Sequence, residues 1–186
     1  MKKLFVLMIG LMATMSVHAQ YSNSSDTPFS QGKAYVGASL SGTDLSYSGL
    51  EKGHLGIQGK VGYFLADNLM GTAQLEYTKN TDVPYAMALG AGGRYYIQQN
   101  GLYLGASVLY KHSATFDELG DKCNFDDFMP SIQVGYAFFL NRSVTIEPEI
   151  YYEQSFKNHK DYSTIGLRIG IGVYLFKDAY KKILNP

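Results

Sequence analysis

Residues 55–80 contain two stretches in which apolar and polar side chains alternate, joined by a short polar turn. In residues 55–65 one face carries Leu, Ile, Val and Tyr, while the other carries mainly Gly, Gln and Lys. Residues 69–78 repeat this alternation after Ala66-Asp67-Asn68, and Asp and Asn tolerate tight-turn geometry. Alternation with a period of two residues is typical of a β-strand, so this segment predicts an antiparallel hairpin.

The same alternation continues through most of the chain from Lys33 to Phe176. It predicts an all-β protein, an eight-stranded antiparallel up-and-down transmembrane β-barrel. Strands of roughly nine to thirteen residues have the length that a tilted strand needs to cross a bilayer. Pro130 and Pro148 are expected at bulges or strand ends, because proline cannot donate to the ladder. Besides the opening hairpin, strands are predicted around residues 33–40, 85–97, 102–111, 128–138, 144–153 and 164–175.

The predicted connections alternate between short and long. Short turns at one end and longer loops at the other are typical of an outer-membrane barrel. An even number of strands then returns both termini to the short-turn, periplasmic side. The short connections are residues 66–68, 98–101 and 141–142, and the longer ones are residues 42–54, 80–84, 112–127 and 156–161.

Aromatic residues on the apolar face are concentrated near strand ends, with Val, Ile, Leu, Ala and Gly between them. Such rings favour the headgroup region, so the pattern predicts two aromatic girdles around an aliphatic band that meets lipid. The girdle toward the long loops comprises Tyr77, Tyr85, Tyr110, Phe128 and Tyr152, and the girdle toward the short turns comprises Tyr63, Tyr95, Tyr136 and Phe138.

The polar face is rich in glycine, which a water-exposed outer surface would not need. The interior of a narrow eight-stranded barrel does need small residues beside large ones such as Tyr35, Tyr103 and Tyr151. The polar face is therefore predicted to point inward. Its glycines are Gly37, Gly56, Gly62, Gly90, Gly92, Gly105, Gly135, Gly166, Gly170 and Gly172.

Several stretches resemble the small outer-membrane β-barrel proteins of Gram-negative bacteria, the OmpA/OmpX-like group often called porin family. They are the hairpin VGYFLADNLMGTAQLEY, the stretch IEPEIYY and the closing segment IGLRIGIGVYLF. The resemblance covers essentially residues 33–176. It implies a monomer inserted by the outer-membrane barrel machinery, in contact with outer-membrane lipids and lipopolysaccharide. One departure is that the family usually ends on an aromatic residue, whereas Phe176 is followed by KDAYKKILNP.

The charged residues of the inward face nearly cancel. Because isolated buried charges are costly, we expect ion pairs that fill the lumen and hold the strands together. Arg168 is the predicted hub, since its strand must neighbour the strand of Glu147, Glu149 and Glu153. A pore gated by exchange of partners is the alternative, although eight strands leave little free interior. The predicted lumen network is Lys33, Lys60, Glu76, Arg94, Lys111, Glu147, Glu149, Glu153 and Arg168.

The chain ends suggest an exported protein. Residues 1–19 combine a positive start, an apolar core and a small-residue cleavage site, as in a Sec signal peptide. The apolar run is too short for a membrane-spanning helix. Residues 20–32 are predicted to form a linker, and residues 177–186 a short periplasmic tail. A formal net charge of zero argues against a nucleic-acid surface, and the single cysteine, Cys123, excludes an intramolecular disulfide.

No catalytic, cofactor or metal site can be assembled from the sequence. His54, His112 and His159 lack the spacing of metal ligands. His112-Ser113, near Asp117 and Glu118, resembles a base and nucleophile only superficially. The acidic segment 112–127 could bind a divalent ion but is more simply a solvated loop. Three function classes remain: a non-enzymatic anchor that presents loops, a narrow channel, and a lipid-modifying enzyme.

Overall fold

The structure, a computed structural model, describes residues 27–46, 51–80, 85–97, 100–116, 122–157 and 163–175. The predicted signal peptide, Phe176 and the predicted tail lie outside these residues. No helix in the described ranges is long and apolar enough to cross a membrane. The strands are β1 (Ala34–Ser46), β2 (Glu51–Ala66), β3 (Leu69–Asn80), β4 (Tyr85–Tyr96), β5 (Leu102–Phe116), β6 (Lys122–Tyr136), β7 (Phe138–Phe139), β8 (Val144–Glu153) and β9 (Thr164–Leu175).

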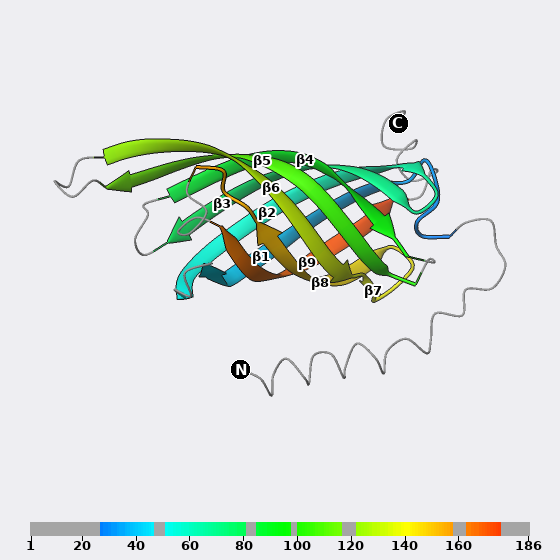
Figure 1. Ribbon diagram of the computed structural model, residues 1–186. Coiled ribbons are helices and arrows are strands. Elements are labelled where there is room, and N and C mark those ends of the chain that lie inside the picture. Colours follow the sequence, from blue (N-terminus) through cyan, green and yellow to red (C-terminus); the bar gives the residue numbers. More distant parts are fainter. Residues whose placement is uncertain are drawn as a thin grey trace, which may run out of the picture.

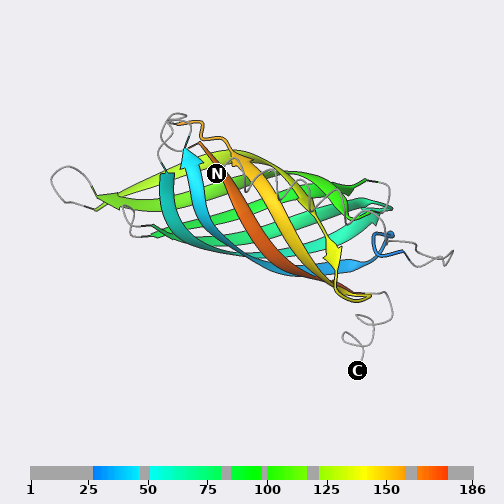
Figure 2. The same cartoon turned by 90° about the horizontal axis from the view of Figure 1, so that it is seen from below.

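Strands that follow one another in the chain pair antiparallel, from β1 through β6 (Figure 1). The sheet then closes on itself, because β9 pairs with both β1 and β8, and β8 pairs with β6. Figure 2 shows β1 and β9 side by side at this closure. The short β7 continues the line of β6 against β8, so nine segments form eight barrel strands. The predicted eight-stranded up-and-down barrel is confirmed.

The predicted strand at residues 128–138 is interrupted at Ala137, which separates β6 from β7. The backbone N–H of Ala137 donates to the carbonyl of Gly101, 2.8 Å away, and so continues the ladder toward β5. On the facing strand, Pro148 has no N–H to offer. The ladder resumes at Phe138 opposite Ile146, in the same register as Gly135 opposite Glu149. Pro148 therefore lies within β8, opposite the break in the ladder between β6 and β7, and not at a strand end.

Two of the predicted long loops are mostly strand, and that part of the prediction was wrong. β1 runs to Ser46 and β2 begins at Glu51, while β5 reaches Phe116 and β6 begins at Lys122. Figure 1 shows β5 and β6 projecting beyond the neighbouring strands. The backbone ladder can continue where a hairpin leaves the barrel. In these extensions the sequence no longer alternates between apolar and polar residues.

The side-chain burial is the reverse of that in a water-soluble barrel. Leu89 and Ile169 are each 64% exposed on the outer surface. Lys60 and Arg94 are 4% and 3% exposed inside. The aliphatic face therefore points outward and the polar face fills the lumen.

Apolar side chains in the lumen gather in two clusters. A small cluster contains Ala88, Leu109 and Met129. A larger, mainly aromatic cluster lies toward the short turns and contains Phe29, Tyr35, Phe64, Met70, Tyr96, Tyr103, Ala137 and Tyr174.

Candidate functional site: the charged lumen and its aromatic seal

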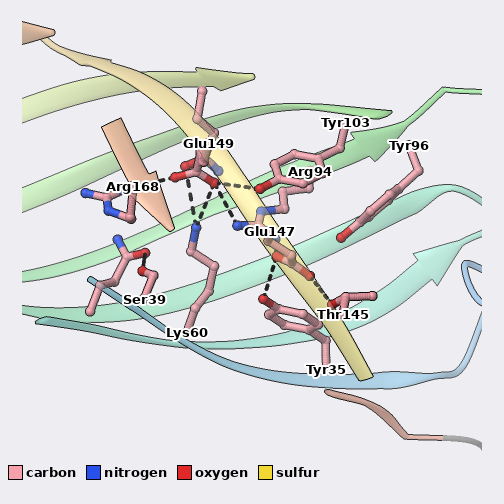
Figure 3. A network of polar contacts seen from close by, with 12 residues as sticks. Tyr35, Ser39, Lys60, Arg94, Tyr96, Tyr103, Thr145, Glu147, Glu149 and Arg168 are labelled. Carbon is pink, nitrogen blue, oxygen red and sulfur yellow. Dashed lines mark hydrogen bonds and ion pairs between the residues drawn. The ribbon is translucent and has the colours of Figure 1, made fainter. Parts of the chain in front are cut away.

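Glu149 lies at the centre of the lumen and contacts cations from three other strands. Its carboxylate oxygens are 2.8 Å from Arg94 Nη2 on β4 and 2.9 Å from Arg168 Nη1 on β9. Lys60 Nζ on β2 lies 3.6 Å away. The hydroxyl of Tyr103 donates to the same carboxylate at 3.0 Å (Figure 3). Glu149 thus links its own strand β8 to β2, β4 and β5 across the interior and to the neighbouring β9.

Glu147 is two residues away on the same face of β8 and binds a different set of donors. Arg94 Nη1 and the hydroxyl of Tyr35 both approach its Oε2 at 2.8 Å. Thr145 Oγ1 and the hydroxyl of Tyr174 donate to its Oε1 at 2.8 and 3.0 Å. Each of its two oxygens thus accepts from two donors, which offsets the cost of burying the carboxylate.

Arg168 joins a second set of carboxylates. It contacts Glu149 and Glu76, and its Nη2 lies 3.6 Å from Glu153 Oε1. Its guanidinium also lies over the ring of Tyr151, with Cζ 4.0 Å from the ring centroid. The structure therefore brings Arg168 to Glu149 and Glu153, whereas Glu147 pairs with Arg94. Glu149 is shared by both arginines, so the network has two hubs instead of the one expected from sequence.

The remaining predicted lumen charges lie toward the barrel ends. Near the long loops, Lys111 Nζ is 3.9 Å from Glu153 Oε2, and Lys111 is 28% exposed. At the opposite end, Lys33 Nζ donates to the carbonyl of Thr27 and lies outside the central network.

Asp127 is a lumen residue that the sequence prediction placed in a loop. It is 4% exposed and accepts a hydrogen bond from Ser155 Oγ. The sequence did contain a signal for this position. Asp127 continues the alternating inward positions of Met129 and Ser131 on β6. Its carboxylate adds a fifth acidic group to the four that were predicted.

The larger omission is Phe29, within the segment predicted to be a linker. Its side chain is fully buried, and its ring stacks on Tyr96 at a centroid distance of 4.1 Å. The rings of Tyr174, Phe139 and Phe64 surround it at 5.5, 5.7 and 6.2 Å. The segment Thr27–Gly32 thus inserts an aromatic side chain into the short-turn end of the barrel. A lone Phe in an otherwise polar stretch was the only sequence signal.

Backbone bonds hold this inserted segment in place. The carbonyl of Phe29 accepts from Asn68 N at 2.8 Å, and Gly32 N donates to the carbonyl of Phe64 at 2.9 Å. Gln31 N also donates to Asp67 Oδ1 at 2.8 Å. The turn between β2 and β3, where Asn68 has a φ of 67°, therefore serves as the docking point for the segment.

Little free volume remains around the charges. The cavity lined by Tyr35, Lys60, Arg94, Glu149 and Arg168 measures about 10 Å³. That is the space of roughly one water molecule. The charged layer and the aromatic cluster toward the short turns are thus both densely packed.

Similarity to known proteins is found in the fold and not in the sequence. No family model matches the chain, and no curated protein sequence matches it. Among solved structures, Neisserial surface protein A superposes with a TM-score of 0.58 at 17% identity, over 76% of this chain and 95% of that one. The chain has the fold of the small outer-membrane β-barrels.

Two further solved structures support this assignment of fold. The N-terminal β-barrel domain of Pseudomonas aeruginosa OprF gives a TM-score of 0.56 at 15% identity, covering 78% of this chain and 98% of that one. The Yersinia pestis outer membrane protein Ail, in a phospholipid bilayer nanodisc, gives 0.52 at 11% identity, covering 78% and 100%.

The predicted girdle residues of this barrel all lie on its outward phase. At each end of the barrel two of them form a ring pair. The ring centroids of Tyr110 and Phe128 are 5.2 Å apart, and those of Tyr136 and Phe138 are 4.4 Å apart. Tyr63, Tyr77, Tyr85, Tyr95, Tyr110 and Phe128 are exposed, and Tyr136, Phe138 and Tyr152 are half-buried.

Among the histidines considered for chemistry, only the side chain of His112 is described by the structure. His112 Nδ1 lies 2.6 Å from Asp126 Oδ1 on the outer surface, beyond the girdle. Its hydrogen bond holds the pKa of Asp126 below the usual range of a carboxyl. The described residues hold no group of three potential metal ligands. The structure does not describe the side chains of His54, Asp117, Glu118, Cys123 and His159.

Proposed function

We propose that this chain is a non-enzymatic integral outer-membrane protein whose barrel is closed to solutes. It serves envelope structure and surface interaction through the loops and hairpins at its extracellular end. Both termini then lie in the periplasm, and residues 1–19 direct export.

Membrane residence is supported by the outer surface of the barrel. Soluble monomers rarely expose apolar patches larger than a few hundred Å². Here exposed aliphatic side chains occur on all eight barrel strands, and aromatic rings lie at both ends of the band. Examples from opposite sides of the barrel are Ile57, Leu89, Ile132 and Ile169, each more than half exposed. Hydrocarbon is the environment that such a surface requires.

The observation that carries the closed-barrel proposal is the position of Glu149. Its contacts to Arg94 and Lys60 span the interior between strands that are not adjacent, and Arg168 reaches it from the neighbouring β9. Opening a pore there would separate buried ion pairs, and breaking one such pair costs roughly 3–5 kcal/mol. The aromatic cluster around Phe29 adds a second barrier toward the short turns. A charged lumen of this kind favours an anchor over a channel.

The expected surroundings follow from the same proposal. The aliphatic band contacts outer-membrane lipids and the outer end contacts lipopolysaccharide, while the barrel insertion machinery assembles a monomer. The β5–β6 hairpin, which projects furthest from the barrel, is the element best placed to meet an external partner.

Planar-bilayer recording of the purified wild-type protein tests the proposal. We expect no long-lived conductance steps, together with extraction only by detergent. Recovery of the native protein as a soluble periplasmic monomer would refute membrane residence. Large, stable open channels would instead favour the narrow-channel alternative.

A further inference from the structure

The outer wall of the barrel contains an apolar groove where β6, β8 and β9 meet. Its volume is about 150 Å³, and its surface is almost entirely apolar. The buried Glu149 and Arg168 of the lumen network also border it, so the groove lies directly behind the charged layer. Its outward-facing lining includes Val134, Tyr136, Pro148, Ile150, Leu167 and Ile169.

The groove follows from the gap in the ladder between β6 and β7. Pro148 stands between Ile146 and Ile150 on the outward phase of β8, and its compact ring replaces a longer aliphatic side chain. Opposite Pro148, Tyr136 lacks an assigned ladder partner on β8, since the pairing stops at Gly135. The surface is therefore hollowed where one short side chain and one ladder gap coincide.

We propose that this groove binds an acyl chain of a membrane phospholipid. The inference rests on the proposed function, because it requires the aliphatic face to meet lipid. The groove is continuous with that face, and it lacks exposed polar atoms that would hold water. An apolar cavity of about 150 Å³ is large enough for a benzene-sized hydrocarbon. A flexible chain of methylene groups fits an apolar groove of this volume.

The depth of the groove indicates which half of the membrane supplies the lipid. Pro148 is the fifth residue of β8, so it lies roughly 13 Å along the strand from the short-turn end. Half of the hydrocarbon thickness is about 15 Å. The groove therefore belongs to the leaflet next to the short turns, which is the periplasmic leaflet in the proposed orientation.

The rim of the groove suits a phospholipid that enters from that side. Tyr136 and Phe138 form a ring pair at 4.4 Å and lie at the girdle level. In the turn that follows β7, Arg142 is exposed. A guanidinium there complements a lipid phosphate, since arginine forms charge-assisted bonds with phosphate oxygens. The acyl chain would occupy the groove while the headgroup stays near this turn.

Tryptophan fluorescence provides a direct test, because the chain contains no Trp. Tyr136→Trp places a reporter on the rim, and Tyr95→Trp places a matched reporter in the same girdle on β4. Both variants are folded into phosphatidylcholine vesicles whose acyl chains carry bromine, a contact quencher. We expect quenching of both reporters relative to unbrominated vesicles, with stronger quenching of Tyr136→Trp, since a chain held in the groove stays in contact with the ring.

Filling the groove should abolish the excess quenching. Pro148→Leu and, independently, Val134→Phe add bulk over the groove and are combined with Tyr136→Trp. Both should reduce its quenching to the level of Tyr95→Trp, and the shift between unheated and boiled samples on a gel verifies folding. Pro148→Leu also restores a backbone N–H, whereas Val134→Phe does not. A loss of the excess quenching in both variants is therefore due to filling of the groove.

The possible outcomes separate this inference from the proposed function. Equal quenching of the two reporters, or an excess that persists after both fillings, would overturn the lipid site and leave the membrane barrel intact. Weaker quenching of Tyr136→Trp would mean that protein, such as a second copy of the chain, covers the groove. Absence of quenching in both reporters would overturn the proposed function itself.

Discussion

Arg94 Nη2 lies 2.8 Å from Glu149 Oε2, although β4 and β8 are separated in the sheet by β5 and β6. The pair therefore spans the lumen and does not simply link two neighbouring strands. The same arginine also binds Glu147, and its guanidinium lies 4.2 Å from the ring centroid of Tyr103. Such a contact stabilises the closed barrel only while all of its partners remain charged and in place.

The first prediction concerns the shared carboxylate. Glu149→Gln keeps the side-chain shape but leaves Arg94, Arg168 and Lys60 around a neutral group. We expect a loss of roughly 3–5 kcal/mol in unfolding free energy, the cost of breaking a buried ion pair. Urea unfolding in phospholipid vesicles measures it.

Glu153→Gln is the matched control for that experiment. Its carboxylate oxygens lie 3.6 Å from Arg168 Nη2 and 3.9 Å from Lys111 Nζ, and Lys111 is partly exposed. The control should therefore lose less stability than Glu149→Gln. Equal losses would show that Glu149 has no special position in the network.

The second prediction compares a lumen residue with a lipid-facing residue on the same strand. Arg168→Ala removes the cation that faces Glu76, Glu149 and Glu153. Ile171→Ala removes only packing at a site that is 57% exposed on the outer surface. Arg168→Ala should lower the unfolding free energy more, as measured in the same vesicles. A larger effect of Ile171→Ala would contradict a structural role for the charges.

Much of this architecture could be predicted from the sequence because one rule governs most of the chain. In a closed barrel every strand separates lipid from lumen. The alternation at residues 55–65 and 164–175 therefore shows where a strand lies and which of its side chains point into the lumen. That rule placed Lys60, Arg94 and Arg168 inside the barrel. It could not assign partners, since the contact between Arg94 and Glu149 depends on the tilt and closure of the whole sheet.

The rule fails where strands stop separating two environments. In the projecting parts of β5 and β6 neither face is lipid or lumen, so alternation no longer reveals the strand. Phe29 is buried through a turn outside the strands, which has no periodicity at all. Asp127 lies at the boundary, and its inward phase is visible only after β6 is known to begin at Lys122.

The third prediction tests the outward face in lipid. Leu167→Arg and Ile169→Arg place a charge among aliphatic side chains that are 46% and 64% exposed. Each should reduce the unfolding free energy by roughly 2–4 kcal/mol, the cost of arginine at the bilayer midplane. Thr164→Arg, on the inward phase and opposite Glu153, should cost much less. If all three variants unfold alike, the aliphatic face does not meet hydrocarbon.

The fourth prediction concerns the aromatic seal. Phe29→Ala removes a fully buried ring that stacks on Tyr96 at 4.1 Å and opens space among Tyr174, Phe139 and Phe64. Truncating a buried Phe to Ala costs roughly 3–5 kcal/mol in a well-packed core. The unfolding free energy should fall by an amount within this range, roughly 3–5 kcal/mol.

Phe156→Ala is the control, since Phe156 is 72% exposed and its truncation should leave stability nearly unchanged. Bilayer recording adds a second readout. Phe29→Ala alone should remain non-conducting, because the layer of Glu149, Arg94 and Arg168 still fills the lumen. Brief conductance steps are expected only when Phe29→Ala and Glu149→Gln are combined. Steady conductance from Phe29→Ala alone would show that the seal is the main barrier and that the charged layer is permeable.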